Sequence, residues 1–281
     1  MLHNRWLRRV LLLVLLVSFG YAMPLHAFLE KSFLFFPTSD LTGTPATVGL
    51  DYREVAFAAS DGQPLAGWLI PGQEGAPVVV FCMGNYGNMS HRLDNLRLLH
   101  QLGVSLFIFD YRGYGQSGGN ISEAGSYADL RGAVVWLAEQ GFPPPRTILF
   151  GRSLGAAIAL EVALGYRPAG LILEAPFSSI RVMGLTHYPL LYRLLGWLFD
   201  AEYDNLGKIG RLQSPLLILH GDRDTICPPA MAEQLYQAAP SPKRLEWLRG
   251  AGHNDTLVVG GARYLEIWRE FLGGLGAETG G

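Results

Sequence analysis

Two serines of the chain, Ser117 and Ser153, stand in the spacing Gly-x-Ser-x-Gly that surrounds nucleophilic serines. A nucleophile elbow needs a strand that runs straight into the serine and a helix that leaves at once. The apolar run ILFG leads into Ser153, and the helical pattern LGAAIALEVAL follows it. Ser117 instead follows a loop rich in tyrosine and glycine and precedes Gly-Gly-Asn. We therefore predict that Ser153 is a nucleophile for acyl transfer and that Ser117 is a loop residue.

A serine hydroxyl becomes nucleophilic when a histidine removes its proton. Three histidines follow Ser153, namely His187, His220 and His253. His220 ends an apolar strand pattern, which favours a structural role, and His187 lies in a segment without strand character. His253 lies in the glycine loop GAGHND, between the last strand pattern and the last helical pattern. This loop can reach across the strand ends, so we predict His253 as the general base.

The histidine in turn needs an acid that fixes its tautomer and stabilises its charge. The segment HGDRDT offers Asp222 and Asp224. Asp222 directly follows a glycine and can bind its own turn, a common role of aspartate. Asp224 lies further round the loop and is favoured, although much of this preference comes from the resemblance described below. Asp255 is too close to His253 along the chain to be the preferred partner.

The oxyanion that forms during acyl transfer needs hydrogen-bond donors already in place. One donor is expected from the backbone N–H of Leu154, the residue after the nucleophile. The second is expected from the loop MGNYGN, residues 83–88, in which Gly84 allows the backbone to approach the site. We predict the backbone N–H of Asn85 as this donor.

These residues must be held by a sheet, and the chain shows the pattern of one. An alternating pair of strands is expected at 52–58 and 65–70, joined by the turn Ser-Asp-Gly. Nearly continuous apolar runs at 77–83, 104–111, 147–150, 170–174 and 215–220 indicate strands buried on both faces. Helical periodicity lies between them at 88–102, 122–140, 154–166, 229–239 and 260–272. The chain is thus predicted to form a doubly wound, mostly parallel α/β sheet.

One segment, about 177–213, has no strand pattern and contains the leucine- and aromatic-rich run LLYRLLGWLF. It is predicted to be a small lid inserted between the sixth and seventh strands. The 281 residues allow one large domain or two small ones, and 49% apolar composition is enough for a sizeable core. A net charge of −2 without a basic run in the body gives no electrostatic basis for nucleic-acid binding. Cys82 and Cys227 are far apart and suggest neither a metal site nor a disulfide framework.

The N-terminus differs in kind from the rest of the chain. Arg5, Arg8 and Arg9 precede an uncharged stretch at 10–29, which is about long enough to span a bilayer. We expect residues 1–30 to be an uncleaved anchor and residues 31–281 to be the hydrolase domain. A cleaved signal peptide, with Gly-Tyr-Ala at 20–22 as its site, is the alternative. Either way the body lies on the non-cytoplasmic side of the membrane, anchored in one case and secreted or periplasmic in the other.

These features together resemble the α/β-hydrolase superfamily. The resemblance covers about 33–272 and rests on SDGQPLAGWLIPG, MGNYGN, FDYRGYGQSGG, GRSLGAAIA, LHGDRDTICPP and GAGHND, in this order. It is strongest to small membrane-anchored serine hydrolases, which include depalmitoylase-like proteins, and the superfamily also includes serine aminopeptidases. It implies an α/β-hydrolase fold with Ser153, Asp224 and His253 as the triad, and an oxyanion hole in the loop after the third strand. The chain departs from the usual His-Gly of that loop, because Met83 precedes Gly84.

The reaction so implied is hydrolysis of a carboxylic ester or thioester through an acyl-enzyme on Ser153. The expected substrate is a small molecule or an acylated molecule of lipid type, and neither a cofactor nor a metal is required. A serine peptidase would use the same triad and stays an alternative. A non-catalytic binding protein on the same fold is a further one.

Overall fold

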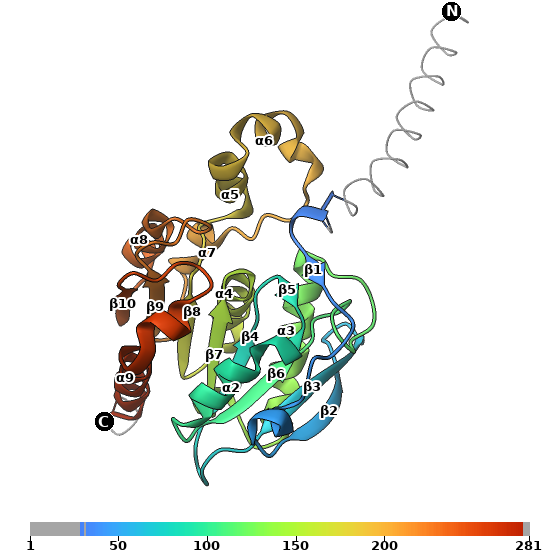
Figure 1. The fold of residues 1–281 in the computed structure, drawn as a ribbon, viewed down its shortest axis with the longest axis vertical. Helices are drawn as coiled ribbons and strands as arrows, with labels where there is room; N and C mark the ends of the chain where they lie inside the picture. Colours follow the sequence, from blue (N-terminus) through green and yellow to red (C-terminus); the bar gives the residue numbers. More distant parts are fainter. Residues whose placement is uncertain (1–28, 31, 278–281) are drawn as a thin grey trace, which may run out of the picture.

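The computed structural model describes residues 29, 30 and 32–277, which are built around one twisted sheet of eight strands (Figure 1). The strands lie in the order β10-β9-β8-β7-β4-β6-β3-β2. Their bounds are β2 (Arg53–Ala58), β3 (Pro64–Ile70), β4 (Val78–Cys82), β6 (Ser105–Phe109), β7 (Thr147–Arg152), β8 (Gly170–Glu174), β9 (Leu216–Gly221) and β10 (Lys243–Leu248). The predicted opening hairpin is confirmed, because β2 and β3 pair antiparallel. The neighbouring strands β6, β4, β7, β8 and β9 pair parallel, as their continuous apolar runs predicted, and β10 adds to β9 in the same direction.

Helices cover both faces of the sheet, which is why its central strands are buried throughout. On one face pack α3 (Glu123–Glu139), α4 (Leu154–Tyr166) and α8 (Pro229–Ala238). On the other pack α2 (Leu93–His100) and α9 (Thr256–Ala277). Phe150 of β7 shows how tightly this second layer is packed. Its ring stacks on Phe81 with 4.5 Å between the ring centroids and meets Trp268 edge-on with 4.9 Å between the centroids.

The last helical segment, α9 (Thr256–Ala277), consists of two helices that meet at Gly261, where φ of 50° and ψ of −128° are non-helical. The helix predicted at 260–272 corresponds to the second of these, which runs on to Ala277, and a short helix from Thr256 precedes it. Shorter elements complete the fold: η1 (Pro45–Val48), η2 (Met89–Arg92), η3 (Pro144–Arg146), and a parallel pairing of β1 (Phe36–Pro37) with β5 (Tyr86–Gly87). This pairing ties the start of the domain to the loop after β4.

Between β8 and β9 the chain leaves the sheet and forms α5 (Ile180–His187), α6 (Pro189–Leu195), η4 (Gly196–Leu198) and α7 (Asn205–Ile209). As predicted, no strand occurs between 176 and 214. Figure 1 shows α5 and α6 standing away from the sheet, beyond the carboxyl ends of β7 and β8. Whether this segment acts as a lid stays a prediction.

The predicted anchor or signal segment lies almost wholly outside the residues that the structure describes. Within the part that is described, no helix is long and apolar enough to cross a membrane.

Candidate active site

Ser153 lies at a sharp turn between β7 and α4, in the conformation of a nucleophile elbow. Its φ of 54° and ψ of −116° are strained for a residue with a side chain. Its backbone N–H donates to the Glu174 carbonyl of β8 at 2.9 Å, which holds the turn against the sheet. Both glycines of the motif are required by packing, because a Cβ on Gly151 or Gly155 would overlap neighbouring backbone carbonyls. The fold therefore presents the serine at the carboxyl end of the central strand.

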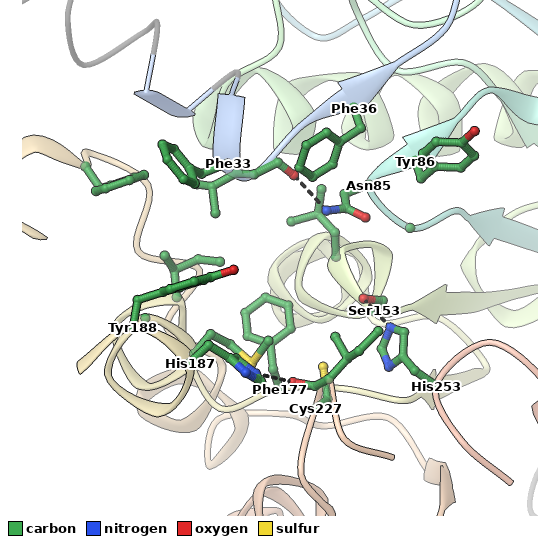
Figure 2. A pocket seen from close by; sticks show the side chains of 18 of the residues that line it. Phe33, Phe36, Asn85, Tyr86, Ser153, Phe177, His187, Tyr188, Cys227 and His253 are labelled. Carbon is green, nitrogen blue, oxygen red and sulfur yellow. Dashed lines mark hydrogen bonds between the residues drawn. The ribbon is translucent and has the colours of Figure 1, made fainter. Parts of the chain in front are cut away.

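A continuous chain of hydrogen bonds joins Ser153, His253 and Asp224. The Ser153 Oγ lies 3.0 Å from His253 Nε2 (Figure 2). His253 Nδ1 lies 2.7 Å from Asp224 Oδ2. Because an ionised carboxylate can only accept, Nδ1 carries the proton and Nε2 is left to accept the serine proton. The structure thus brings together the three predicted residues, from loops about 30 to 100 positions apart along the chain. Such an arrangement can move a proton from the serine to the histidine.

Asp224 is only 3% exposed and is held by its own loop. Its Oδ1 accepts the backbone N–H groups of Ile226 and Cys227, each at 2.8 Å. Burial by itself would raise the pKa of the Asp224 carboxyl, but the hydrogen bond and charge of His253 and the Cys227 N–H outweigh it and lower the pKa below its ordinary value. The carboxylate therefore stays ionised beside the histidine.

The competing aspartates have other partners. Asp222 accepts the backbone N–H of Gly250 at 2.6 Å, so it joins the β9 loop to the loop before His253 instead of binding its own turn. Asp255 accepts the N–H of Gly252 at 2.6 Å within its own loop. Among the described residues, neither carboxylate is hydrogen-bonded to His253.

The other two histidines also lie where the sequence placed them. His220 is fully buried and its Nε2 lies 2.8 Å from the Cys227 carbonyl, with Asp224 Oδ2 further away at 3.5 Å. Burial lowers the pKa of His220 below its ordinary value, so its ring is neutral at pH 7. His187 is exposed at the end of α5, and its Nε2 lies 2.7 Å from the Ile226 carbonyl. Ser117, as predicted, is a loop residue whose Oγ donates to the Asp110 carbonyl at 2.7 Å.

The loop after β4 passes beside Ser153, as the oxyanion prediction requires. A Cβ on Gly84 would lie 3.6 Å from the Ser153 Cβ, so the backbone there is close to the serine. Neither the Asn85 N–H nor the Leu154 N–H has a hydrogen-bond acceptor among the described residues. The Tyr111 hydroxyl donates to the buried Met83 carbonyl at 3.1 Å, which fixes the residue that replaces the usual histidine.

A cavity of about 770 Å³ opens beside Ser153 and His253. Its apolar lining comes from the helical segment and from the first residues of the domain, and includes Leu29, Phe33, Phe36, Leu191, Leu195 and Phe199. Figure 2 shows Phe33 and Phe36 on one side of this space and Tyr188 on another, with Ser153 and His253 at a third. The sequence did not predict that residues 29–36 form a wall of the site.

A second group of polar residues, which the sequence analysis missed, supports the triad. Arg152 Nε lies 3.0 Å from Glu174 Oε1, and Arg152 Nη2 donates to the His253 carbonyl at 2.8 Å. The buried Glu174 also accepts the hydroxyls of Thr256 at 2.7 Å and Tyr264 at 2.6 Å. This network ties the ends of β7 and β8 to the His253 loop and α9. A buried glutamate at the end of the GLILE strand was the signal that could have indicated it.

Asp224, Cys227 and His253 place one ligand atom each within 4.8 Å of one another, which a metal ion could exploit. Two features oppose this. Asp224 and His253 already share a short hydrogen bond, and burial raises the pKa of the Cys227 thiol, which disfavours the thiolate that metals bind.

Comparison with known families agrees with this geometry. The family model described as serine aminopeptidase, S33, a hydrolase family, matches residues 73–207 and 204–256. The chain belongs to this α/β-hydrolase family. Its relatives include an uncharacterized protein of Mycobacterium tuberculosis, 38% identical over 94% of each chain. The α/β-hydrolase domain-containing protein WAV2 of Arabidopsis thaliana is 32% identical over 82% of this chain and 81% of its own.

Solved structures with lower sequence identity share the same fold. The esterase Pf2001 of Pyrococcus furiosus superposes with a TM-score of 0.68 at 21% identity, over 84% of this chain and 98% of its own. At this identity the likeness concerns the fold. Family membership and this fold together support hydrolase activity.

Proposed function

We propose that this α/β-hydrolase is a serine hydrolase that cleaves carboxylic ester or thioester bonds through an acyl-enzyme on Ser153. The observation that carries the proposal is the hydrogen-bonded chain from Ser153 through His253 to Asp224, next to a cavity of substrate size. Such a constellation is recognised by geometry and by the role of each member.

In the proposed first step His253 Nε2 removes the proton of the Ser153 hydroxyl as Oγ attacks the carbonyl carbon. The histidine then gives this proton to the leaving alcohol or thiol, and the acyl group stays on Oγ. In the second step His253 takes a proton from water as the water oxygen attacks the acyl carbon, and it then returns this proton to Ser153 Oγ as the C–Oγ bond breaks and the acid leaves. Asp224, ionised throughout, stabilises the imidazolium that forms in both steps.

The negative charge of each tetrahedral intermediate would be held by the N–H groups of Asn85 and Leu154. Both donors are without an acceptor among the described residues, and the loop that carries Asn85 is fixed from several sides. The Asn85 side-chain amide donates to the Leu34 carbonyl at 2.9 Å. The backbone carbonyl of Asn85 accepts from the Tyr114 hydroxyl at 2.8 Å. Donors held in place before the reaction are worth about 2.7–4 kcal/mol each in such sites.

The proposed substrate has an apolar acyl group. The cavity walls that face Ser153 carry leucine and phenylalanine side chains from α6 and from the start of the domain. Burying an acyl chain there removes apolar surface from water, at about 0.8 kcal/mol per CH₂ group. This supports acyl or lipid-type esters and thioesters over small polar ones.

The family description names a serine aminopeptidase, which is the second candidate. An enzyme that recognises a free α-amino group needs a negative partner for it. No aspartate or glutamate is among the described residues that line the cavity. We therefore favour the esterase or thioesterase.

For the N-terminus we propose that residues 1–30 anchor domain 31–281 to a membrane, with the hydrolase on the non-cytoplasmic side and segment 177–213 as its lid. The basic cluster and uncharged run support this, and a relative from Saccharomyces cerevisiae, 35% identical over 82% of each chain, is described as a membrane protein. The protein should resist carbonate extraction from membranes. A soluble protein that begins just after residue 22 would support the secreted alternative.

The nucleophile is tested by fluorophosphonate labelling of the wild type, Ser153→Ala and Ser117→Ala. Labelling should vanish in Ser153→Ala only, because the Ser117 hydroxyl donates its hydrogen bond to the Asp110 carbonyl. Hydrolysis of p-nitrophenyl esters from C2 to C16, matched thioesters and peptide amides then defines the bond. Absent labelling of a folded wild type would indicate a binding protein, and faster cleavage of amides a peptidase.

A further inference from the structure

Two arginines, Arg92 and Arg152, line the same cavity as Ser153 and His253. No carboxylate is among the described lining residues, but Glu174 behind them forms an ion pair with Arg152. Arg92 therefore contributes the positive charge of the wall that no carboxylate pairs with among the described residues, and most of the remaining lining is apolar. A neutral ester would not require this charge.

Arg152 forms an ion pair with the buried Glu174 and donates to the carbonyl of His253, although its Nε, like that of Arg92, has no hydrogen-bond partner among the described residues. Arg92 has no carboxylate within ion-pair distance there. Its one hydrogen bond among the described residues runs from Nη2 to the Tyr86 carbonyl at 2.7 Å, and its buried Nε has no partner there. A planar guanidinium with unused donors is suited to a carboxylate or phosphate, which it can bind through two parallel hydrogen bonds.

Arg92 contacts the loop after β4, which passes Ser153. Its guanidinium binds the backbone of this loop, which contains Gly84 and Asn85. Burial and the nearby charge of Arg152 lower the pKa of Arg92 to about 10, so it is charged at pH 7 but poorly compensated. A bound anion would offset both the burial of the Arg92 charge and its repulsion by Arg152.

We infer that Arg92 binds an anionic group of the substrate, a carboxylate or a phosphate, close to the scissile carbonyl. The inference rests on the proposed function and narrows its substrate class to esters or thioesters that combine an apolar acyl group with a negative charge. In this account Arg92 is a specificity-determining residue, and Arg152 supports the His253 loop.

The competing explanation is that Arg92 only fixes the loop after β4 through the Tyr86 carbonyl. Three esters separate the two roles: phenyl butyrate, 3-carboxyphenyl butyrate and 3-(butyryloxy)phenyl phosphate. We expect the wild type to prefer at least one charged ester. In Arg92→Met, kcat/KM for the preferred charged ester relative to the neutral one should fall by about tenfold or more, the effect of one charge-assisted hydrogen bond. The two charged esters distinguish carboxylate from phosphate.

Arg181→Met is the matched control, because it removes the same charge from an exposed arginine of α5 that does not line the cavity. It should leave the ratio between charged and neutral esters unchanged. Equal losses on all three esters in Arg92→Met would show a loop-positioning role. A wild type without preference for either charged ester would likewise overturn the inference.

Binding without turnover separates this inference from the proposed function. Benzoate and phenylphosphonate are titrated calorimetrically into Ser153→Ala and into Ser153→Ala/Arg92→Met. We expect the Kd of at least one probe to rise by about tenfold or more in the double variant. Unchanged binding would contradict the anion site even if Ser153 is the nucleophile. Retained hydrolysis by Ser153→Ala would overturn the nucleophile but leave an Arg92-dependent Kd intact.

Discussion

Beneath the cavity, at the carboxyl ends of β7, β8 and β9, lies a layer of buried polar side chains, which we call the floor, whereas the roof, from α5 to η4, carries exposed apolar ones. In the floor Asp224 and Glu174 are at most 3% exposed, and each accepts several hydrogen bonds. In the roof α6 has no buried residue, and Leu190 and Trp197 are 72% and 70% exposed.

This difference separates two tasks. The proposed acyl transfer needs atoms held in one geometry, and the floor holds each proposed catalytic group against strand ends and backbone N–H groups. The roof is anchored by the buried Ile180 and Leu198, but α6 between them has no buried residue. In the proposed function its exposed apolar side chains contact the acyl chain or a lipid surface. Changes in the floor should therefore alter the rate for every substrate, and changes in the roof should alter which substrate is preferred.

The largest effect is expected from Asp224→Asn in the floor. The amide cannot hold His253 in the tautomer that accepts from Ser153, so kcat for p-nitrophenyl butyrate should fall by about 10⁴-fold. Asp222→Asn is the matched control, because Asp222 accepts the Gly250 N–H and is not hydrogen-bonded to His253. In this variant kcat should fall only a few-fold. Comparable losses in the two variants would mean that the acid has been assigned to the wrong aspartate.

A backbone change in the floor should have the next largest effect. In Gly155→Ala the new Cβ would overlap the Cys82 carbonyl and displace the elbow, and a shift of about 1 Å can cost about 100-fold in rate. The melting temperature should also fall, by about 2–4 °C for each kcal/mol of overpacking. Gly165→Ala in the same helix meets no atom within 4 Å and should retain full activity. An active, stable Gly155→Ala protein would contradict the elbow packing.

A roof change should act on chain-length preference alone. Leu191 lines the cavity, so Leu191→Ala should lower kcat/KM for C12 and longer esters by about tenfold and leave C2 esters unchanged. Leu190, its neighbour, is exposed and does not line the cavity, so Leu190→Ala should leave the profile as it is. An equal loss of kcat/KM at all chain lengths in Leu191→Ala would show that the roof affects the reaction itself, and would contradict the division of tasks between roof and floor.

The smallest effect concerns the acid side of the pH profile. Because the pKa of Asp224 lies below its ordinary value, the carboxylate stays ionised as the pH falls through mildly acidic values. Its contribution to folding stability is likewise present above its unfolded pKa and is lost only below that value. Asp224 should therefore add no protonation of its own to the acid side of the kcat/KM profile, which should fall no more steeply than about tenfold per pH unit. A hundredfold loss per unit would reveal a second proton.

The floor and the roof also differ in how far the sequence predicts them. Continuous apolar runs predicted the parallel strands because burial on both faces leaves a strong pattern. Ser153 and His253 could be found because an elbow and a glycine loop are local features. The choice between Asp222 and Asp224 needed the resemblance, since the Gly250 N–H that binds Asp222 is distant in sequence.

The contacts that no local pattern encodes were missed. Arg152, Glu174 and Tyr264 meet only after β7, β8 and α9 have packed, so their network has no signature along the chain. The wall formed by Phe33 and Phe36 depends on the pairing of β1 with β5, strands of two residues each.

The most direct test of the central claim is to trap the acyl-enzyme. The wild type is mixed with p-nitrophenyl decanoate, quenched in acid within milliseconds and analysed by intact-protein and peptide mass spectrometry. We predict a decanoyl adduct on the peptide that contains Ser153, formed with a burst of p-nitrophenol and absent from Ser153→Ala. Turnover without an adduct, or an adduct on another residue that persists in Ser153→Ala, would contradict the assignment of Ser153 as the nucleophile.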